Sequence, residues 1–437
     1  MPLVRYAPEK TVPIPPFGRT DISEYLPLIN SAPFQRLKYK TQLSLVKEVF
    51  PGATHSRYLH SLAVMDTTRK ILRSMISRGF FPKEDQQQLE RDLCVAALVH
   101  DIGHPAYSHM AEYVLAALSS NHLNHNTVGE NIIMEEAAEA IIACGSAPER
   151  VKAILDKNSS SLGRLITAKS IGADKLAYLF QDQHMAGYDA VAPPGSVDSF
   201  VFYITPVGEH IGAEEKAEDL LKSLQRFYFE MYTHVYLRKQ CLAVGRMLQK
   251  ALEFHLRESE TDPMEVWHQR EGWIDTQLED SPNLVARRLY ERITLRDIVK
   301  AAIVYKPERY TTAERLAGKS IAVLPLSESE QTQLLHTLSS PLALTSLERR
   351  LAEAYTLPQS GVIVTIVPDP KKLVPEDIFL VDNAGNARGT LFQRLPRFHE
   401  GLQEEAEAFF SIRILVSEEH RAQVASRPFP VSELLAD

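Results

Sequence analysis

Apolar residues recur at helical spacing over most of the sequence, from residue 21 to about 354. This period predicts amphipathic α-helices, each with one face turned towards a core. In one such helix the spacing places on a single face the side chains of His60, Val64, Thr67 and Ile71. His60 is therefore expected to point where the core points.

The two ends of the sequence follow other patterns. Residues 1–20 contain five prolines and little periodicity, so we expect an extended N-terminal arm. Beyond residue 354, the β-branched runs GVIVTIV, DIFLV and FFSIRILV are separated by turn-forming residues, which predicts a small α/β region over 355–437. The run VFYIT predicts one more short strand. The expected fold class is mainly α, with a helical domain and its helical extension over 21–354 between these two ends.

The composition is that of an ordinary globular protein: 437 residues, 44% of them hydrophobic and 24% charged. The formal net charge of -8 does not favour a nucleic-acid partner, although local basic clusters can still hold phosphates. No apolar run reaches the roughly 18 residues of a membrane span, and the first residues lack the apolar core of a signal peptide. We therefore expect a cytoplasmic protein with no membrane partner.

The stretch LCVAALVHDIGHPAYSH concentrates ionisable side chains at the end of an apolar run. His100 and Asp101 follow the run directly, and His104 and His109 come shortly after. Burying such groups without compensation costs roughly several kcal/mol each, so a bound cation or an anionic ligand is the simplest explanation.

Imidazole nitrogen and carboxylate oxygen together suit a first-row divalent metal ion. The adjacent His100 and Asp101 can both reach one ion at a helix end. His60 from the preceding helix and Asp174 from a later one would complete four ligands and leave positions for water or a substrate oxygen. Taken singly, His60 is more often a core histidine bonded to a carbonyl, and Asp174 more often a carboxylate at a helix N-terminus.

A later segment repeats polar side chains at helical spacing. Asp174, Tyr178 and Asp182 follow one another at intervals of four residues, which places them within about 80° of a helix circumference. Lys175 lies beside them. One face of this helix thus carries two carboxylates and a phenol, for which the simpler interpretation is a solvated polar face.

With FQRLKYKTQLSLVKEVFPGATHSRYLHSLAV before the stretch HDIGHPAYSH, the sequence resembles the HD-domain phosphohydrolases. More narrowly, it is similar to the deoxynucleoside triphosphate (dNTP) triphosphohydrolases, the group of bacterial dGTPases and the vertebrate SAM-and-HD-domain dNTPase. The similarity runs from about Pro13 to Lys239. It implies a helical HD core, a divalent metal ion, and hydrolysis of dNTPs to deoxynucleoside and inorganic triphosphate.

The resemblance also implies a role for individual residues. The metal ligands would be His60, His100, Asp101 and Asp174. The residues that match catalytic positions, or histidines facing the triphosphate, are His109, Glu112, His104 and His125. The matching cationic phosphate contacts are Arg57 and Lys175. The positions that match around the sugar are Gln42, Leu43, Tyr178, Asp182 and Tyr236.

Two positions depart from the family pattern. Tyr228 stands where a γ-phosphate arginine belongs, and Asn30 stands where an aspartate reads guanine. The metal implied is one of Mn, Fe, Mg, Zn, Ni or Co, with Mg²⁺ on the substrate phosphates. The implied partners are a dNTP substrate, an activator nucleotide and further copies of the chain in a tetramer or hexamer.

Two other hypotheses stay open at this point. In one, the chain is an HD hydrolase for another phosphate ester, such as a nucleoside monophosphate, a cyclic nucleotide or an alarmone. In the other, it is a nucleotide-sensing or single-stranded nucleic-acid-binding protein with a vestigial HD site. The complete ligand set and the His109–Glu112 pair argue against a vestigial site, and the net acidity argues against nucleic acid.

Overall fold

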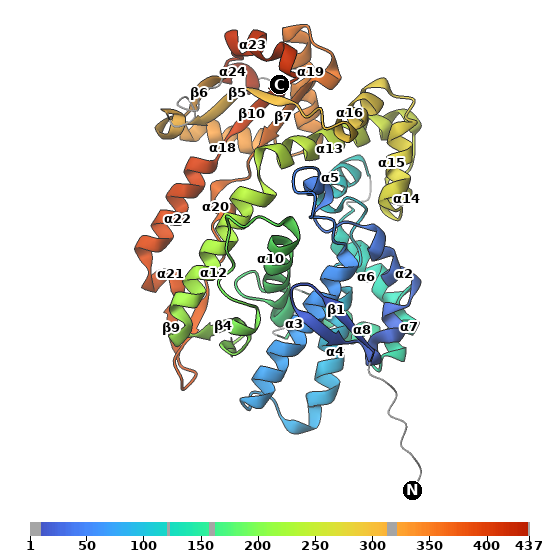
Figure 1. The fold of residues 1–437 in the computed structure, drawn as a ribbon, viewed down its shortest axis with the longest axis vertical. Helices are drawn as coiled ribbons and strands as arrows, with labels where there is room; N and C mark the ends of the chain where they lie inside the picture. The colour runs from blue at the N-terminus through green and yellow to red at the C-terminus, as the bar shows by residue number, and fades with distance from the viewer. Residues whose placement is uncertain (1–9, 120–122, 157–161, 313–320, 436–437) are drawn as a thin grey trace.

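The structure is a computed structural model that describes residues 10–119, 123–156, 162–312 and 321–435. Helices make up most of it, and a four-stranded sheet with its own helices lies at one end (Figure 1). The prediction of a mainly α protein is confirmed. In the described part of the chain, no helix combines the length and the apolar character needed to cross a lipid bilayer.

Three helices form the centre of the helical part. They are α3 (Arg57–Ser77), α4 (Gln86–Val99) and α10 (Ala173–Ala186), and both α4 and α10 pack on α3. Helix α4 is buried at every position from Asp92 to Val99, because other elements surround its last two turns. The apolar run seen in the sequence is therefore the inner end of a core helix, and the predicted helix end before His100 is confirmed.

Further helices of this part surround the centre. They are α1 (Leu26–Ile29), α2 (Ala32–Gln35), α5 (Ser108–Leu118), α6 (His125–Met134), α7 (Ala138–Ala143), α8 (Pro148–Leu155), α9 (Arg164–Thr167), α11 (Asp198–Val201), α12 (Glu218–Met231), α13 (Lys239–Ser259), α14 (Pro263–Trp267), α15 (Glu271–Glu279) and α16 (Leu284–Thr294).

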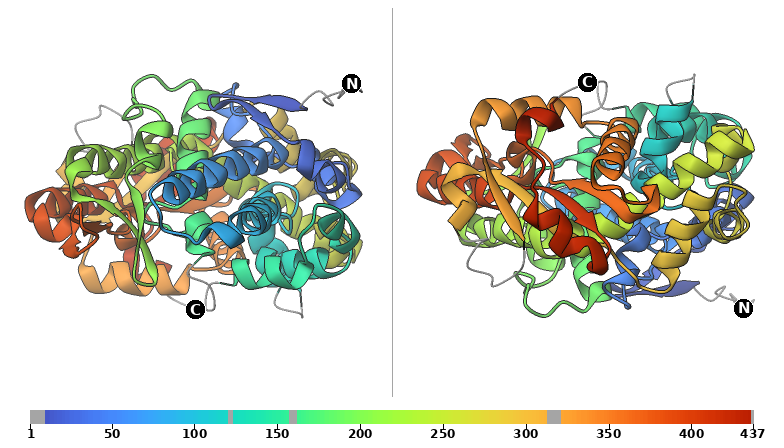
Figure 2. Two further views of the ribbon diagram at one scale, coloured as in Figure 1. Left: turned by 90° about the horizontal axis from the view of Figure 1, so that it is seen from below. Right: turned by 90° about the horizontal axis from the view of Figure 1, so that it is seen from above.

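The four-stranded sheet has the order β6-β5-β10-β7. Its strands are β5 (Lys300–Pro307), β6 (Ala322–Leu326), β7 (Val362–Ile366) and β10 (Ile412–Val416). Strand β10 is antiparallel to both of its neighbours, whereas β5 and β6 are parallel. The view from above in Figure 2 looks onto these strands, coloured from yellow-orange to red. The helices of this part are α18 (Glu328–Thr337), α19 (Pro341–Tyr355), α20 (Pro370–Leu373), α21 (Leu391–Arg394), α22 (Pro396–Phe409), α23 (Glu418–Ser426) and α24 (Val431–Leu434).

The sheet begins earlier in the chain than the sequence predicted. Strands β5 and β6 both precede residue 354, in the stretch expected to be helical. The apolar centre of β5, buried from Ala302 to Lys306, is too short for its periodicity to distinguish a strand from a buried helical turn. The hydrophobic cluster of this sheet accordingly consists of residues from Ala302 onwards, together with Phe229 of α12.

A second sheet ties the C-terminal region back to the helical part. Its order is β3-β4-β8-β9, with strands β3 (Ile204–Val207), β4 (His210–Glu214), β8 (Phe379–Val381) and β9 (Ala387–Thr390). Strand β4 is parallel to β8, so residues far apart in sequence pair directly. Figure 1 shows this sheet with α21 and α22 beside α12.

The predicted N-terminal arm is described only from residue 10, so residues 1–9 lie outside the described part. Its remaining residues are extended, as expected, but they pair with each other in an antiparallel hairpin of β1 (Thr11–Ile14) and β2 (Gly18–Asp21). Ile14 is buried, and the Pro15 carbonyl accepts a hydrogen bond of 3.2 Å from Gln181 of α10. This part of the arm therefore packs on its own chain.

A buried ion triad joins the two parts of the molecule. Glu348 of α19 lies 2.9 Å from Nε of Arg246 and 3.2 Å from Nζ of Lys250, both on α13, and it is fully buried. Its Oε1 also accepts the backbone N–H of Val364 in β7 at 2.9 Å. Burial favours the neutral acid, but the two cations outweigh it and lower the pKa of Glu348.

Replacing Glu348 tests this junction. We expect Glu348→Gln to lower the free energy of unfolding by about 3–5 kcal/mol, because it leaves two buried cations without their counter-charge. Urea denaturation measures the change. The control is Glu353→Gln on the exposed face of the same helix, expected within about 0.5 kcal/mol of the wild type. A Glu348→Gln variant as stable as this control would contradict the assignment.

Candidate functional site

The structure brings His60, His100, Asp101 and Asp174 together. His60 comes from α3, His100 and Asp101 from the end of α4, and Asp174 from the first turn of α10. Nε2 of His60 lies 3.1 Å from an oxygen of Asp174 and 3.7 Å from one of Asp101. Nε2 of His100 lies 3.6 Å from oxygens of both aspartates. The convergence expected from the sequence is therefore present.

The two imidazoles of this cluster have ring nitrogens that the protein does not use. Nδ1 of His100 lies 2.8 Å from the carbonyl of Ala97, which fixes the ring and leaves Nε2 buried without a hydrogen-bond partner. Nε2 of His60 is also buried without one. Orphaned nitrogens facing carboxylates fit a divalent metal ion held by His60, His100 and Asp101, and Asp174 lies close enough to both imidazoles to be a fourth ligand.

The charges of the cluster favour a cation at its centre. Burial opposes protonation of His100, but the carboxylates of Asp101 and Asp174 outweigh it and raise the pKa of His100 to about 9. Burial likewise opposes ionisation of Asp174, yet His100 and His60 hold its pKa at about 2. The Asp174 side chain is 36% exposed, so a ligand can reach this side of the cluster.

Two glycines allow the backbone to position these residues. A Cβ on Gly103, in the turn after Asp101, would lie 2.0 Å from the carbonyl oxygen of His125. A Cβ on Gly172, just before α10, would lie 2.7 Å from backbone atoms of residues 166 and 168. From the other side, the buried Trp267 donates a hydrogen bond of 2.7 Å to the carbonyl of Gly103. The turn is therefore fixed by backbone contacts.

Arg57, predicted to contact phosphate, pairs with the cluster itself. Its guanidinium donates to a carboxylate oxygen of Asp101, and its Nε donates to the Ser108 hydroxyl at 2.9 Å. Tyr107 and Ser108 both have left-handed backbone angles, with φ values of 58° and 50°. Such strain is typical of segments that the surrounding structure holds in place for function.

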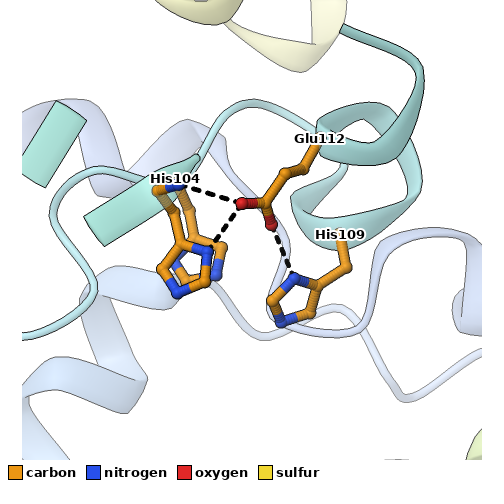
Figure 3. Close-up of side chains that lie close together, drawn as sticks. His104, His109 and Glu112 are labelled. Atoms are coloured by element: carbon orange, nitrogen blue, oxygen red, sulfur yellow. Dashed lines mark hydrogen bonds and ion pairs between the residues drawn. The ribbon is translucent and has the colours of Figure 1, made fainter. Parts of the chain in front are cut away.

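The second cluster contains His104, His109, Glu112 and His125. Figure 3 shows Glu112 and His109, both on α5, pointing towards one another. One oxygen of Glu112 lies 2.7 Å from Nδ1 of His109, and the other lies 2.7 Å from Nδ1 of His125. The same oxygen also accepts the backbone N–H of His125 at 2.9 Å. Glu112 thus orients both imidazoles, and the expected His109–Glu112 pair is present.

The ring geometry of this second cluster does not favour another metal ion. The rings of His104 and His125 are stacked, with centroids 4.1 Å apart and planes 19° from parallel. Metal ligation uses lone pairs in the ring plane, and those of two stacked rings do not converge. Burial, together with the nearby Arg57, lowers the pKa of His104 well below its usual value, so its imidazole is neutral.

Of the residues predicted around the sugar, Tyr178, Asp182 and Tyr236 lie together. The Tyr236 hydroxyl donates to one oxygen of Asp182 at 2.8 Å, and the rings of Tyr178 and Tyr236 are 6.4 Å apart. Tyr236 belongs to a π-helical turn, Tyr232–Tyr236, a feature frequent at functional sites. The side-chain oxygen of Gln42 is buried without a partner, and Leu43 is partly buried against the core.

Lys175, the other predicted phosphate contact, is tied to the protein. Its Nζ donates to the carbonyl of Ser170 at 3.1 Å and to Gln225 at 3.2 Å, and it lies 4.4 Å from the ring centre of Tyr228. Burial lowers the pKa of Lys175 to about 7, only partly opposed by Glu376. At neutral pH, Lys175 therefore carries its proton in a smaller fraction of molecules than a surface lysine does.

Two residues of the site were not found from the sequence. His55 lies 2.7 Å from the oxygen of Asp182 that Tyr236 does not bind, and Lys40 donates to the backbone carbonyl of His104. Both are buried. Lys40 stands in the polar segment KYK, which looks like a solvated surface, and His55 has no periodic neighbours. The sequence pattern therefore did not mark either residue as part of a site.

A large cavity begins at the second cluster. It has a volume of about 1760 Å³ and runs from His109, Tyr113 and Tyr236 to the ends of β7 and α18 in the C-terminal part. Of the residues of the site, His109 and Tyr236 line this cavity, whereas the His/Asp cluster does not.

Comparison with known proteins finds a family model that matches part of this chain. Residues 57–175 match the family model described as "HD domain". The chain is 28% identical to the "uncharacterized protein YwfO" of Bacillus subtilis over 238 residues, or 52% of each chain. It thus spans about half the length of that relative. Deoxynucleoside triphosphate triphosphohydrolase SAMHD1 of Gallus gallus is 37% identical over 141 residues, 29% of this chain and 22% of that protein.

A solved structure extends the likeness to nearly the whole fold. A phosphohydrolase from Bacteroides thetaiotaomicron superposes with a TM-score of 0.69 at 18% identity, covering 94% of this chain and all of that one. At this identity the likeness supports the fold. Residues 57–175 thus match an HD domain, and the His/Asp cluster lies within them.

Proposed function

We propose that the chain is a metal-dependent enzyme that hydrolyses deoxynucleoside triphosphates to a deoxynucleoside and inorganic triphosphate. The observation that carries the proposal is the contact between the two clusters. Nδ1 of His104 lies 3.4 Å from Oδ1 of Asp101, so the His/Glu cluster directly adjoins the His/Asp cluster. One phosphate group can therefore lie against both.

Two further features support a deoxynucleotide as the substrate. A cavity of about 1760 Å³ opens beside His109 and Tyr236, and Tyr178, Asp182 and Tyr236 form a close-packed group with phenol and carboxylate functions. A packed phenol excludes a ribose 2′-hydroxyl, while a carboxylate accepts a hydroxyl proton. The partial similarity to SAMHD1 supports the same substrate class.

His60, His100 and Asp101 would hold the divalent ion, with Asp174 beside the two imidazoles as the fourth ligand. When bound, such an ion polarises a phosphoryl oxygen and makes a coordinated water more acidic. The side chain of Arg57 fixes Asp101, and the backbone carbonyl of Ala97 fixes His100. These contacts keep the ligand atoms turned towards the centre of the site.

The proposed reaction transfers the triphosphate from the sugar to water. The oxygen of a water molecule bonds to the α-phosphorus and releases one proton to solvent, and the bond from the α-phosphorus to the 5′-oxygen of the sugar breaks. The leaving 5′-oxygen needs a proton, which His109 can donate because its side chain is half exposed at the cavity. Glu112 holds Nδ1 of His109 and so directs Nε2 towards the substrate.

A second candidate is hydrolysis of a phosphate ester with fewer charges. The observation that favours it is the position of Lys175, whose donors are used by Ser170 and Gln225 and whose ammonium lies over Tyr228. The site therefore offers few free cations to a triphosphate. A nucleotide-sensing protein without turnover is the remaining alternative.

One assay separates these functions. The purified protein is incubated with each dNTP and Mg²⁺ or Mn²⁺, and the products are resolved by ³¹P NMR. We expect tripolyphosphate and deoxynucleoside. Turnover of monophosphates, cyclic nucleotides or alarmones in place of dNTPs would favour the second candidate, and binding of nucleotide without turnover would favour a sensor.

The metal assignment predicts the behaviour of Asp101→Asn. Metal affinity should fall by more than about 100-fold, because losing a direct ligand costs more than losing an outer-shell partner, typically worth 10–100-fold. Elemental analysis of the purified variant measures this, and turnover should be lost in parallel. The control is Asp189→Asn at an exposed position. An Asp101→Asn protein that keeps both metal and turnover would refute the assignment.

The His/Glu cluster predicts a different result for Glu112→Gln. The amide nitrogen would face an imidazole N–H, so one histidine loses its orientation. We expect kcat to fall by about 10²–10⁴-fold, the range for general acid–base groups, while metal content stays at the wild-type level. Glu135→Gln, on an exposed surface, is the matched control. Unchanged kcat in Glu112→Gln would exclude this cluster from catalysis.

A further inference from the structure

We propose that His55 is a positioning residue that fixes Asp182 and Gln42 to receive the 3′-hydroxyl of the sugar. The inference rests on the proposed function and adds a residue that sets which sugars the site accepts. His55 lies just before α3, and Asp182 lies in the middle of α10. Their contact joins two residues that are 127 positions apart in the sequence.

The side chain of His55 holds one half of a buried carboxylate. Its Nε2 lies 2.7 Å from Oδ1 of Asp182, and both side chains are almost completely buried, with 0% and 2% exposure. The other oxygen, Oδ2, accepts the hydroxyl of Tyr236 at 2.8 Å. Both oxygens of Asp182 are thus fixed by donors from separate segments.

The backbone of His55 holds Gln42, another residue predicted around the sugar. Its carbonyl accepts the N–H of Gln42 at 2.9 Å, and the adjacent residues Thr41 and Ser56 form an antiparallel bridge. The side-chain oxygen of Gln42 is buried and has no partner. Through its backbone and its side chain together, His55 fixes the spacing between two acceptors, Gln42 and Asp182.

This arrangement selects the kind of group that can bind. A carboxylate that already accepts from an imidazole N–H and a phenol still has lone pairs, and the unpaired amide oxygen of Gln42 is also an acceptor. Because both groups are hydrogen-bond acceptors, they bind a hydrogen-bond donor such as a free hydroxyl. A 3′-phosphate, which offers only acceptors and negative charge, would be repelled, and a 2′,3′-dideoxy sugar would leave the acceptors unpaired.

The test compares sugars in wild type and variants. For His55→Leu, His55→Gln and the control His255→Leu, kcat and KM are measured with a dNTP and with the 2′,3′-dideoxy analogue of the same base. His255 is an equally buried histidine outside the site, bonded to Ser281. Metal content and melting temperature are recorded for each protein.

We expect His55→Leu to reduce the preference for the dNTP over its dideoxy analogue by about 10- to 100-fold, the value of a hydrogen bond to a charged group. The loss should appear mainly in KM, with metal content unchanged. His55→Gln should keep most of the preference, because its amide nitrogen occupies the place of Nε2. His255→Leu should keep all of it.

An unchanged preference in a folded His55→Leu protein overturns the inference. If that variant does not fold, His55→Asn is compared with His55→Gln, since the shorter amide does not reach Asp182, and equal preferences again overturn it. If the wild type cleaves no dNTP, the proposed function is wrong. Equilibrium binding of dNTP and dideoxy analogue to the metal-loaded proteins then decides the role of His55, and equal affinities in the wild type overturn it.

Discussion

Two carboxylates and two imidazoles face one another where three core helices meet, and the remaining structure is built around this concentration of charge. The ring nitrogens of His60 and His100 that face the aspartates have no hydrogen-bond partner in the described part of the chain. Buried polar groups are normally paired, because an unpaired one costs about 1–3 kcal/mol. Keeping these atoms unpaired lowers the stability of the fold, and a cation bound between the aspartates and the imidazoles would compensate for that cost.

The surrounding fold keeps that cluster from relaxing. If the turn after Asp101 could move, the side chains would rotate to satisfy one another or reach water. Gly103 instead lies against the backbone of α6, and Trp267 bonds its carbonyl from the opposite side. The ion triad on Glu348 connects α13 to the C-terminal sheet, which completes the wall of the cavity. Rigid support of this kind keeps ligand atoms in place before the ligand arrives.

The sequence predicted those parts of the site that depend on local spacing. The apolar run before His100 and the four-residue interval from Asp174 to Asp182 each follow from helix geometry, and both helices are present. The resemblance to a known family predicted which separate segments come together at the site. Strands β5 and β6, and the contact of His55 with Asp182, depend on pairings over long sequence separations. No periodicity within one segment specifies which distant segment it will meet.

The balance of charge connects the metal cluster to the substrate. Asp101 and Asp174 bring two negative charges to the cluster, and Arg57 offsets one of them through its contact with Asp101. A divalent ion bound with both imidazoles neutral would leave the cluster with a net positive charge, which attracts a phosphate. Since Lys175 is held by Ser170 and Gln225, the proposed triphosphate substrate would be attracted mainly through divalent metal ions. Substrate affinity should then depend on the divalent ion more strongly than on any lysine or arginine of the site.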